Sequence, residues 1–389
     1  MRHIRFRFTA IFAACFLMFA GCSSINTKKA YVKLADGEWN TNYTYVFVHG
    51  LSGWGHYDFL NNFLPYWGLK NGSLIKQLRK EGFKAYDASV DPHGSAWDRA
   101  CELYAQLAGT VVDYGKEHSE RCGHKRYGKD FSKKRLIPVW DEENKINLLG
   151  HSFGGVTVRL LAHLMSEGSE AERNATSPEE LSPLFAGGHA DWIYSVTALA
   201  APHNGTSAYH VPNDQDVEKT RSQKMMEKAN APKKDGRESY DYADYDMHIQ
   251  NAAEINKWLK TIDNAYYFSF PCSATKQVEN GTHEPIAEIM EGMFQYSSRV
   301  IGSFEGMTAD GIMLGKEWQE NDGLVNTISA MAPDYAPQEI ISDKAELKTG
   351  VWYVMPTYIG DHMSIQGGFS IKNNITGFYM EHLERINRL

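Results

Sequence analysis

The residues with the clearest chemical potential form the pentapeptide Gly150-His151-Ser152-Phe153-Gly154, which fits the pattern G-x-S-x-G. An apolar run precedes it and a helical pattern follows, so Ser152 is predicted to lie on a sharp strand–turn–helix connection. Glycines two residues before and after the serine leave room for that turn, because a Cβ atom there would clash. The pattern predicts a serine nucleophile. A glycine-rich βα turn with a capping serine is the alternative.

A serine nucleophile needs a base, an acid that orients the base, and amides that bind the oxyanion. In a strand–turn–helix setting the three side chains follow in the order Ser, Asp or Glu, His. His362 follows a late strand pattern and Asp322 lies in a turn-rich loop before it, so we expect these two as base and acid. The oxyanion donors expected are the backbone amides of Leu51, after the first strong strand, and Phe153. Three rival histidines, each expected on a solvated surface, are His210, His248 and His283.

The elements that must position these residues alternate between strand and helix. Buried-type strands are predicted over residues 44–48, 82–87, 146–149, 192–199, 266–270 and 351–354, and helices over 74–81, 97–118 and 156–165. Such alternation is typical of βαβ units and predicts an α/β fold with a doubly wound, mostly parallel sheet.

Composition narrows the function classes. Apolar residues make up 42% and charged residues 23% of the 389 residues, which is ordinary for a folded globular protein and excludes a disordered chain. The net charge of -8 argues against nucleic acid as the main partner, since phosphates require a basic face. Apart from Cys15 and Cys22, three cysteines remain (Cys101, Cys122 and Cys272), and we expect them to be free buried thiols.

The N-terminus reads as an export signal, with a basic start, an apolar stretch and small residues over 1–21. The tetrapeptide Phe19-Ala20-Gly21-Cys22 resembles the lipobox of bacterial lipoproteins, in which the cysteine is lipidated. The alternative is a plain signal peptide cut nearby. We therefore expect an exported cell-envelope protein anchored through Cys22, with residues 22–40 as a tether and 41–389 as a single catalytic domain.

Several segments, occurring in the same order along the chain, resemble the true lipases of the thermophilic Bacillus group and their staphylococcal and clostridial relatives. These segments are His49–Gly55, Trp97–Glu102, Tyr104–Leu107, Val112–Gly115, Leu181–Phe185, Pro202–Thr206, Glu320–Thr327 and Gly350–Trp352. They spread over nearly the whole chain after the leader. The resemblance implies an α/β-hydrolase fold, hydrolysis of carboxylic esters, and Ser152, Asp322 and His362 as the catalytic triad.

The same resemblance implies a structural zinc site. Lipases of this family hold Zn²⁺ with two aspartates and two histidines, and the matching positions are Asp98, His118, His124 and Asp246. Two imidazoles and two carboxylates suit a closed tetrahedral ion that pins an insertion and leaves no open position for a reactive water. Cys122, between the histidines, is a soft ligand that could compete.

Two departures from the family pattern stand out. Ser364 and Phe369 occupy positions where the family has acidic calcium ligands, which counts against a calcium site. The lid region, residues 207–245, is shorter and more charged than the family's lid, so we expect it to cover little apolar surface.

These observations lead to one expected function and two alternatives. We expect an exported, monomeric triacylglycerol lipase or esterase whose ester or lipid substrate enters an open site, favouring short acyl esters or polyesters. The first alternative is an acyltransferase that uses the same triad and excludes water. The second is a binding lipoprotein on a hydrolase scaffold without catalysis.

Overall fold

The computed structural model describes residues 38–209, 236–308, 311–342, 346–369 and 373–389. Its centre is a seven-stranded sheet with the order β13-β14-β7-β6-β5-β1-β2, in which all neighbouring strands run parallel. The strands are β1 (Thr44–Val48), β2 (Ala85–Ala88), β5 (Ile146–His151), β6 (Ile193–Leu199), β7 (Tyr266–Phe270), β13 (Gln338–Ile340) and β14 (Trp352–Val354). The predicted α/β fold with a parallel sheet is confirmed.

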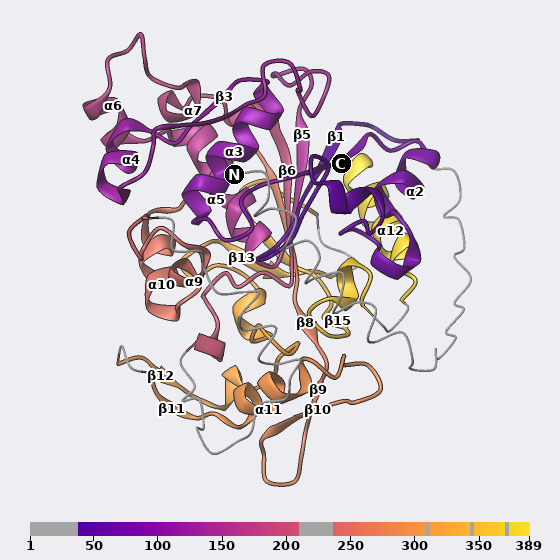
Figure 1. Ribbon diagram of the computed structural model, residues 1–389. Helices are drawn as coiled ribbons and strands as arrows, with labels where there is room; N and C mark the ends of the chain where they lie inside the picture. Colours follow the sequence, from indigo (N-terminus) through magenta and orange to yellow (C-terminus); the bar gives the residue numbers. More distant parts are fainter. Residues whose placement is uncertain (1–37, 210–235, 309–310, 343–345, 370–372) are drawn as a thin grey trace.

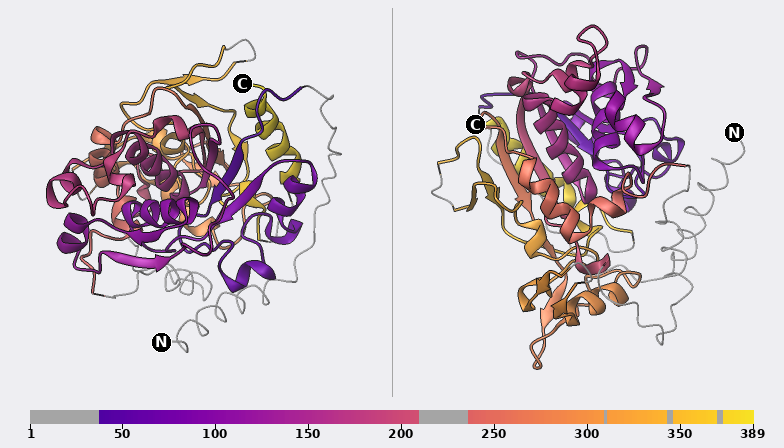
Figure 2. Two further views of the ribbon diagram at one scale, coloured as in Figure 1. Left: turned by 90° about the horizontal axis from the view of Figure 1, so that it is seen from above. Right: turned by 90° about the vertical axis from the view of Figure 1, so that its left-hand side faces the viewer.

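Helices cover both faces of this sheet, which explains why its central strands β1, β5 and β6 are almost entirely buried. In β1, Val46 and Val48 pack in the cluster that contains α3 and α5, whereas Tyr45 and Phe47 face the cluster that contains α2 and α12. Figures 1 and 2 show these two helical layers with the sheet between them. The helices are α2 (Leu74–Lys80), α3 (Ala96–Ala108), α4 (Lys116–Cys122), α5 (Phe153–Glu167), α6 (Glu170–Ala175), α7 (Pro183–Ala186), α9 (Ala243–Asp246), α10 (Ile249–Trp258), α11 (Gln295–Ser303) and α12 (Ile375–Asn387).

Short two-stranded sheets lie outside the central sheet in the described part of the chain. Helix α11 and two antiparallel hairpins gather at one end of the molecule, at the bottom of Figure 1. The small pairs are β3 (Val111–Asp113) with β4 (Tyr127–Asp130), β8 (Cys272–Ser273) with β15 (Tyr358–Ile359), β9 (Thr275–Gln277) with β10 (His283–Pro285), and β11 (Gly306–Met307) with β12 (Met313–Leu314).

The helix predicted over 97–118 is wrong in its second half. Helix α3 ends at Ala108, because Gly109 adopts the left-handed conformation (φ 71°) that commonly closes a helix. The chain then forms the short strand β3, with Val112 fully buried, before α4 begins. His118 therefore belongs to α4, a separate helix whose position depends on tertiary packing.

Several predicted features lie outside the described residues. They are the export signal over 1–21, the tether up to residue 37, the lipidation site Cys22, the rival histidine His210, and most of the lid region 207–245. Among the residues that the structure does describe, no helix is both long and apolar enough to cross a membrane. Cys101, Cys122 and Cys272 are buried and free, which confirms the prediction for these thiols.

Candidate active site and metal-binding cluster

Ser152 lies between β5 and α5 in a backbone conformation that non-glycine residues rarely adopt, with φ 56° and ψ -131°. Its two flanking glycines are required by space. A Cβ on Gly150 would lie 2.2 Å from the Gly154 carbonyl oxygen, and one on Gly154 would lie 2.3 Å from the Val48 carbonyl oxygen. Strain of this kind costs on the order of 1–3 kcal/mol and persists only where packing enforces it. The backbone therefore has the sharp strand–turn–helix connection that the sequence predicts at Ser152.

Asp322 and His362 meet although they lie 40 residues apart. His362 Nδ1 lies 2.8 Å from Asp322 Oδ2, and the His362 amide donates to the Asp322 carbonyl oxygen, also at 2.8 Å. The amides of Leu324 and Val325 donate to Asp322 Oδ1. Both members of the pair are almost fully buried. This pattern fixes the proton on Nδ1 and leaves Nε2 as the basic nitrogen.

Two residues that sequence analysis did not single out connect the loops of the site. The Gly50 amide donates to the Tyr66 hydroxyl (3.0 Å), which contacts His151 Nδ1 at 2.6 Å. His151 Nε2 contacts the carbonyl oxygen of His362 at 2.7 Å. Burial lowers the pKa of His151 well below its usual value, so the ring is neutral, donates from Nε2 and accepts from Tyr66. No sequence signal distinguishes Tyr66 from the other 20 tyrosines.

The turn after β1 approaches Ser152 closely. A Cβ on Gly50 would lie 2.7 Å from Ser152 Cβ, so only glycine fits there. Within the described part of the chain, Ser152 and His362 make no hydrogen bond to each other. Catalytic contacts of this kind are often long without substrate and tighten when substrate binds. The structure therefore gathers the elbow, the β1 turn and the His362 loop at one point.

Four side chains from α3, α4, the following loop and the segment before α9 converge on a second site. His118 Nε2 lies 3.0 Å from Asp98 Oδ1 and 3.3 Å from Asp241 Oδ1. His124 Nε2 lies 3.7 Å from Asp98 Oδ1 and 3.4 Å from Asp241 Oδ2. Donor atoms about 2.0–2.1 Å from a tetrahedral Zn²⁺ stand about 3.3–3.4 Å apart. The side chains of Asp98, His118, His124 and Asp241, with distances of 3.0 to 3.7 Å between their facing atoms, are therefore close enough together to hold one tetrahedral metal ion.

The prediction of Asp246 as the fourth donor needs correction. Asp246 Oδ2 accepts a hydrogen bond from the Ala96 amide at 2.7 Å and so supports the start of α3. Asp241 takes the place facing the histidines, because it precedes α9 whereas Asp246 ends that helix. The family resemblance assigned this role to Asp246, which lies five residues after Asp241 in the same acidic segment.

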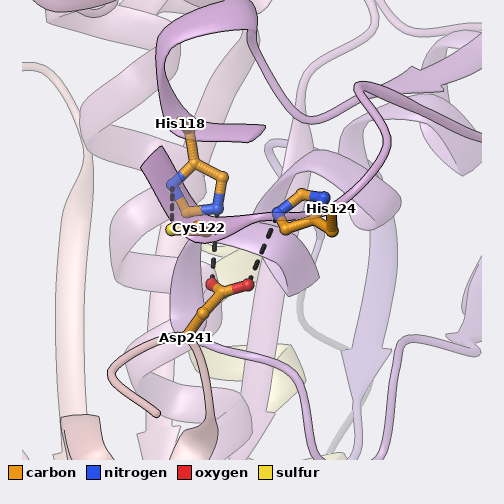
Figure 3. A group of neighbouring side chains, drawn as sticks. All are labelled: His118, Cys122, His124 and Asp241. Atoms are coloured by element: carbon orange, nitrogen blue, oxygen red, sulfur yellow. Dashed lines mark hydrogen bonds and ion pairs between the residues drawn. The ribbon is translucent and has the colours of Figure 1, made fainter. Parts of the chain in front are cut away.

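Cys122 lies beside the cluster. One donor atom each from His118, Cys122, His124 and Asp241 lie within 4.8 Å of one another. However, Cys122 Sγ faces His118 Nδ1 at 3.7 Å, whereas Asp98 and Asp241 face Nε2 of that ring. Figure 3 shows the thiol and the Asp241 carboxylate on different nitrogens of His118. The thiol therefore contacts the His118 nitrogen that does not face the two carboxylates.

Two buried carboxylates face the two imidazoles of this cluster, and the Arg237 guanidinium also pairs with Asp98 Oδ2 at 3.0 Å. Burial and the nearby Asp241 carboxylate raise the pKa of Asp98. Burial by itself lowers the pKa of His118, but hydrogen bonds to Asp241 and Asp98 outweigh it and raise that pKa to about 11. His124 Nε2 and Asp241 Oδ2 are buried without a hydrogen-bond partner. A divalent ion would satisfy both atoms, so the residues present fit zinc.

The loop after His362 has a different character. The Ser364 hydroxyl donates to Asp361 Oδ1 at 2.7 Å, and the Phe369 amide donates to Glu291 Oε1 at 3.0 Å. Across the described ranges, the metal-type cluster around His118 is the sole one found, and none lies beside His362. Ser364 and Phe369 are thus held in this loop by hydrogen bonds to other residues of the chain.

Comparison with known proteins places these features in a family. The family described as "Lipase-like, C-terminal domain" matches residues 41–236 and 230–377. A lipase of Staphylococcus hyicus is 32% identical over 88% of this chain and 58% of its own length, and lipase 2 of Staphylococcus aureus is 32% identical over 84% of this chain and 50% of its own length. The chain thus spans about half the length of the curated relatives it matches.

Solved structures extend this result. EstA from Clostridium botulinum is 32% identical with a TM-score of 0.77, covering 93% of this chain and 90% of its own. The Staphylococcus hyicus lipase structure is 30% identical with a TM-score of 0.73, covering 91% of this chain and 98% of its own. Lipase 1 from Pelosinus fermentans is 32% identical with a TM-score of 0.72, covering 90% and 99%. The chain therefore belongs to this family of bacterial lipases, the one that its motifs resemble.

Proposed function

We propose that this chain is an exported carboxylic ester hydrolase with Ser152 as nucleophile, His362 as base and Asp322 as the acid that orients the base. The observation that carries the proposal is the buried 2.8 Å contact between Asp322 and His362. The backbone carbonyl oxygen of His362 also accepts a hydrogen bond from His151, the residue next to Ser152. The family relationship supports the same function, because the relatives that match most of this chain are named lipases.

The reaction follows from these positions. His362 Nε2 takes the proton of the Ser152 hydroxyl as Oγ attacks the ester carbonyl, and Asp322 stabilises the imidazolium that forms. The tetrahedral intermediate collapses, the C–O bond to the alcohol breaks, and His362 gives its proton to the leaving alkoxide oxygen. Water, deprotonated by the same imidazole, then attacks the acyl-enzyme and releases the acid and free Ser152.

The oxyanion of both tetrahedral intermediates is assigned to the amides of Leu51 and Phe153. Phe153 is the first residue of α5, where the helix leaves amides without intrahelical acceptors and carries a partial positive charge. Neither amide donates to an acceptor among the described residues, so both are available to substrate. The close approach of Gly50 to Ser152 supports Leu51 as the second donor, because its amide belongs to the next peptide of the same turn.

The metal cluster has a structural role in this proposal. Asp98, His118, His124 and Asp241 would hold Zn²⁺ and cross-link α3, α4 and the segment before α9. A site closed by four protein donors supplies folding stability and leaves no position for a reactive water.

The substrate follows from the short, charged lid region 207–245. A segment of that kind covers little apolar surface and leaves the cleft open. We therefore propose that the substrates are short acyl esters or polyesters and not esters with long acyl chains. We also propose anchoring to a membrane through lipidated Cys22.

The test is hydrolysis of p-nitrophenyl esters of two to sixteen carbons by protein that begins after Cys22, with Ser152→Ala in parallel. Loss of at least about a thousandfold in kcat in the variant is expected, since the nucleophile is removed. The profile of rate against chain length then tests the substrate assignment. Activity that survives in Ser152→Ala refutes the nucleophile. Transfer of the acyl group to added alcohol in preference to water favours the acyltransferase alternative.

A further inference from the structure

Arg99 is a buried cation that the proposed mechanism does not use. It follows Asp98 on α3 and is fully buried. Its guanidinium donates to the carbonyl oxygens of His49 (2.5 Å) and Asp91 (2.9 Å) and to the Thr157 hydroxyl (2.9 Å). It also lies over the Phe153 ring, 5.2 Å from the centroid. Arg99 thus touches both segments that carry the proposed oxyanion donors.

The character of these contacts argues for a role beyond packing. Within the described ranges, no carboxylate forms an ion pair with Arg99, and all three acceptors are neutral oxygens. An arginine guanidinium stays charged in proteins, so this contact network buries a cation. The carboxylates of Asp91 and Glu102 attract this charge without contacting it. Burying a charge that lacks a directly bonded carboxylate is unfavourable, and an apolar side chain would pack the same space at lower cost. The planar fork, however, holds several oxygens at fixed angles, as no apolar side chain can.

The contact to His49 leads to the oxyanion loop. His49 Nε2 accepts a hydrogen bond from the Val90 amide (3.2 Å), so the ring proton sits on Nδ1. Nδ1 donates to the Gly50 carbonyl oxygen at 2.8 Å, and that carbonyl shares its peptide group with the Leu51 amide. Burial, with the charge of Arg99, lowers the pKa of His49 to about 3, which keeps the ring neutral. The peptide that carries the proposed donor is thereby fixed and polarised.

We propose that Arg99 is a positioning residue for the oxyanion hole, holding the His49–Leu51 turn against the start of α5. Arg99 follows Asp98 on α3, and Asp98 contacts His118 and His124 in the candidate metal cluster. Arg99 therefore connects the oxyanion loop to the helix that carries this cluster. The inference rests on the proposed function, because it assigns a role in binding the oxyanion. A displacement of about 1 Å in such a group is enough to lower the rate about a hundredfold.

The experiment compares Arg99→Met and Arg99→Lys with the wild type. Active sites are counted by titration with a fluorophosphonate left to react to completion, and kcat and KM are then measured for p-nitrophenyl butyrate. The inhibition constant of an alkyl trifluoromethyl ketone, which forms a tetrahedral oxyanion adduct with the serine, is measured in parallel. We expect kcat per titrated site and the affinity for the ketone to fall together, by about 10–100-fold in Arg99→Met, with KM within about threefold. Arg99→Lys should recover part of the loss.

A matched control is Arg159→Met. Arg159 is also buried, lies on α5 and donates to Asn256 Oδ1 at 2.8 Å, away from the oxyanion loop. We expect its loss to lower the melting temperature and the fraction of titratable sites, while kcat per site and ketone affinity stay near wild type. If Arg99→Met behaves in the same way, the positioning role is refuted and Arg99 is structural.

The two levels of proposal fail differently. Activity that persists in Ser152→Ala removes the proposed function and the role of Arg99 with it. Activity that is lost in Ser152→Ala but unchanged per site in Arg99→Met removes the role of Arg99 alone.

Discussion

Replacement of Asp322 by Asn tests how the base is oriented, and the structure predicts what the amide would do. Asp322 Oδ2 faces His362 Nδ1 at 2.8 Å, while Oδ1 accepts the amides of Leu324 (3.0 Å) and Val325 (2.8 Å). In Asp322→Asn the single oxygen must stay on these two amides, because an NH₂ group cannot accept them. The NH₂ then faces Nδ1, and the imidazole proton moves to Nε2.

An imidazole protonated on Nε2 cannot take the Ser152 proton. Loss of the correct tautomer, together with loss of the charge that stabilises the imidazolium, is worth about 10³–10⁴-fold in kcat. That factor corresponds to about 4–5.5 kcal/mol of transition-state free energy. KM should stay within about threefold, since Asp322 is buried behind the histidine.

The assay is the initial rate of p-nitrophenyl butyrate hydrolysis per titrated active site at pH 8, with the melting temperature as a check on folding. The matched control is Asp361→Asn, a buried carboxylate beside His362 that binds the Glu291 amide and the Ser364 hydroxyl. We expect its kcat to change less than about threefold. A folded Asp322→Asn variant with a kcat loss below tenfold would refute the assigned orientation of His362.

Three further predictions concern the metal, the elbow and pH. Asp241→Asn should abolish zinc retention, measured by plasma mass spectrometry after dialysis, and remove the rise in melting temperature that zinc causes; Asp246→Asn should keep both, and the reverse result would restore the sequence prediction. Gly154→Ala should lower the free energy of unfolding by more than about 2 kcal/mol in urea, because its Cβ would lie 2.3 Å from a carbonyl oxygen, whereas Gly292→Ala, with open space around it, should change it little. Burial raises the pKa of Asp361 to about 7, so the folded protein keeps a proton that the unfolded chain loses near pH 4. The stability that this difference contributes is lost as pH rises toward 7, and the melting temperature should fall over that range. Asp361→Asn should flatten the fall, and an unchanged slope would contradict the assignment.

The parts of the fold that were predictable depend on local patterns. The run over Thr44–Val48 is apolar from Tyr45 onward, and the structure buries Tyr45–Val48 between two helical layers. The elbow at Ser152 was predictable for the same reason, since two glycines, a strand and a helix lie within a few residues. The helix over 97–118 failed because apolar spacing continued past Gly109, where the left-handed conformation ends the helix.

Sequence by itself determined the class of fold, the strained serine and, through family motifs, the pairing of Asp322 with His362 that the structure describes. Only tertiary structure decided the choice between Asp241 and Asp246, because both lie in one acidic segment and the turn into α9 selects which carboxylate faces the histidines. It also decided the contacts of Tyr66, His151 and Arg99, which join segments 50 to 211 residues apart. Hydrogen bonds between distant loops depend on how strand ends converge, and a linear pattern does not record that convergence.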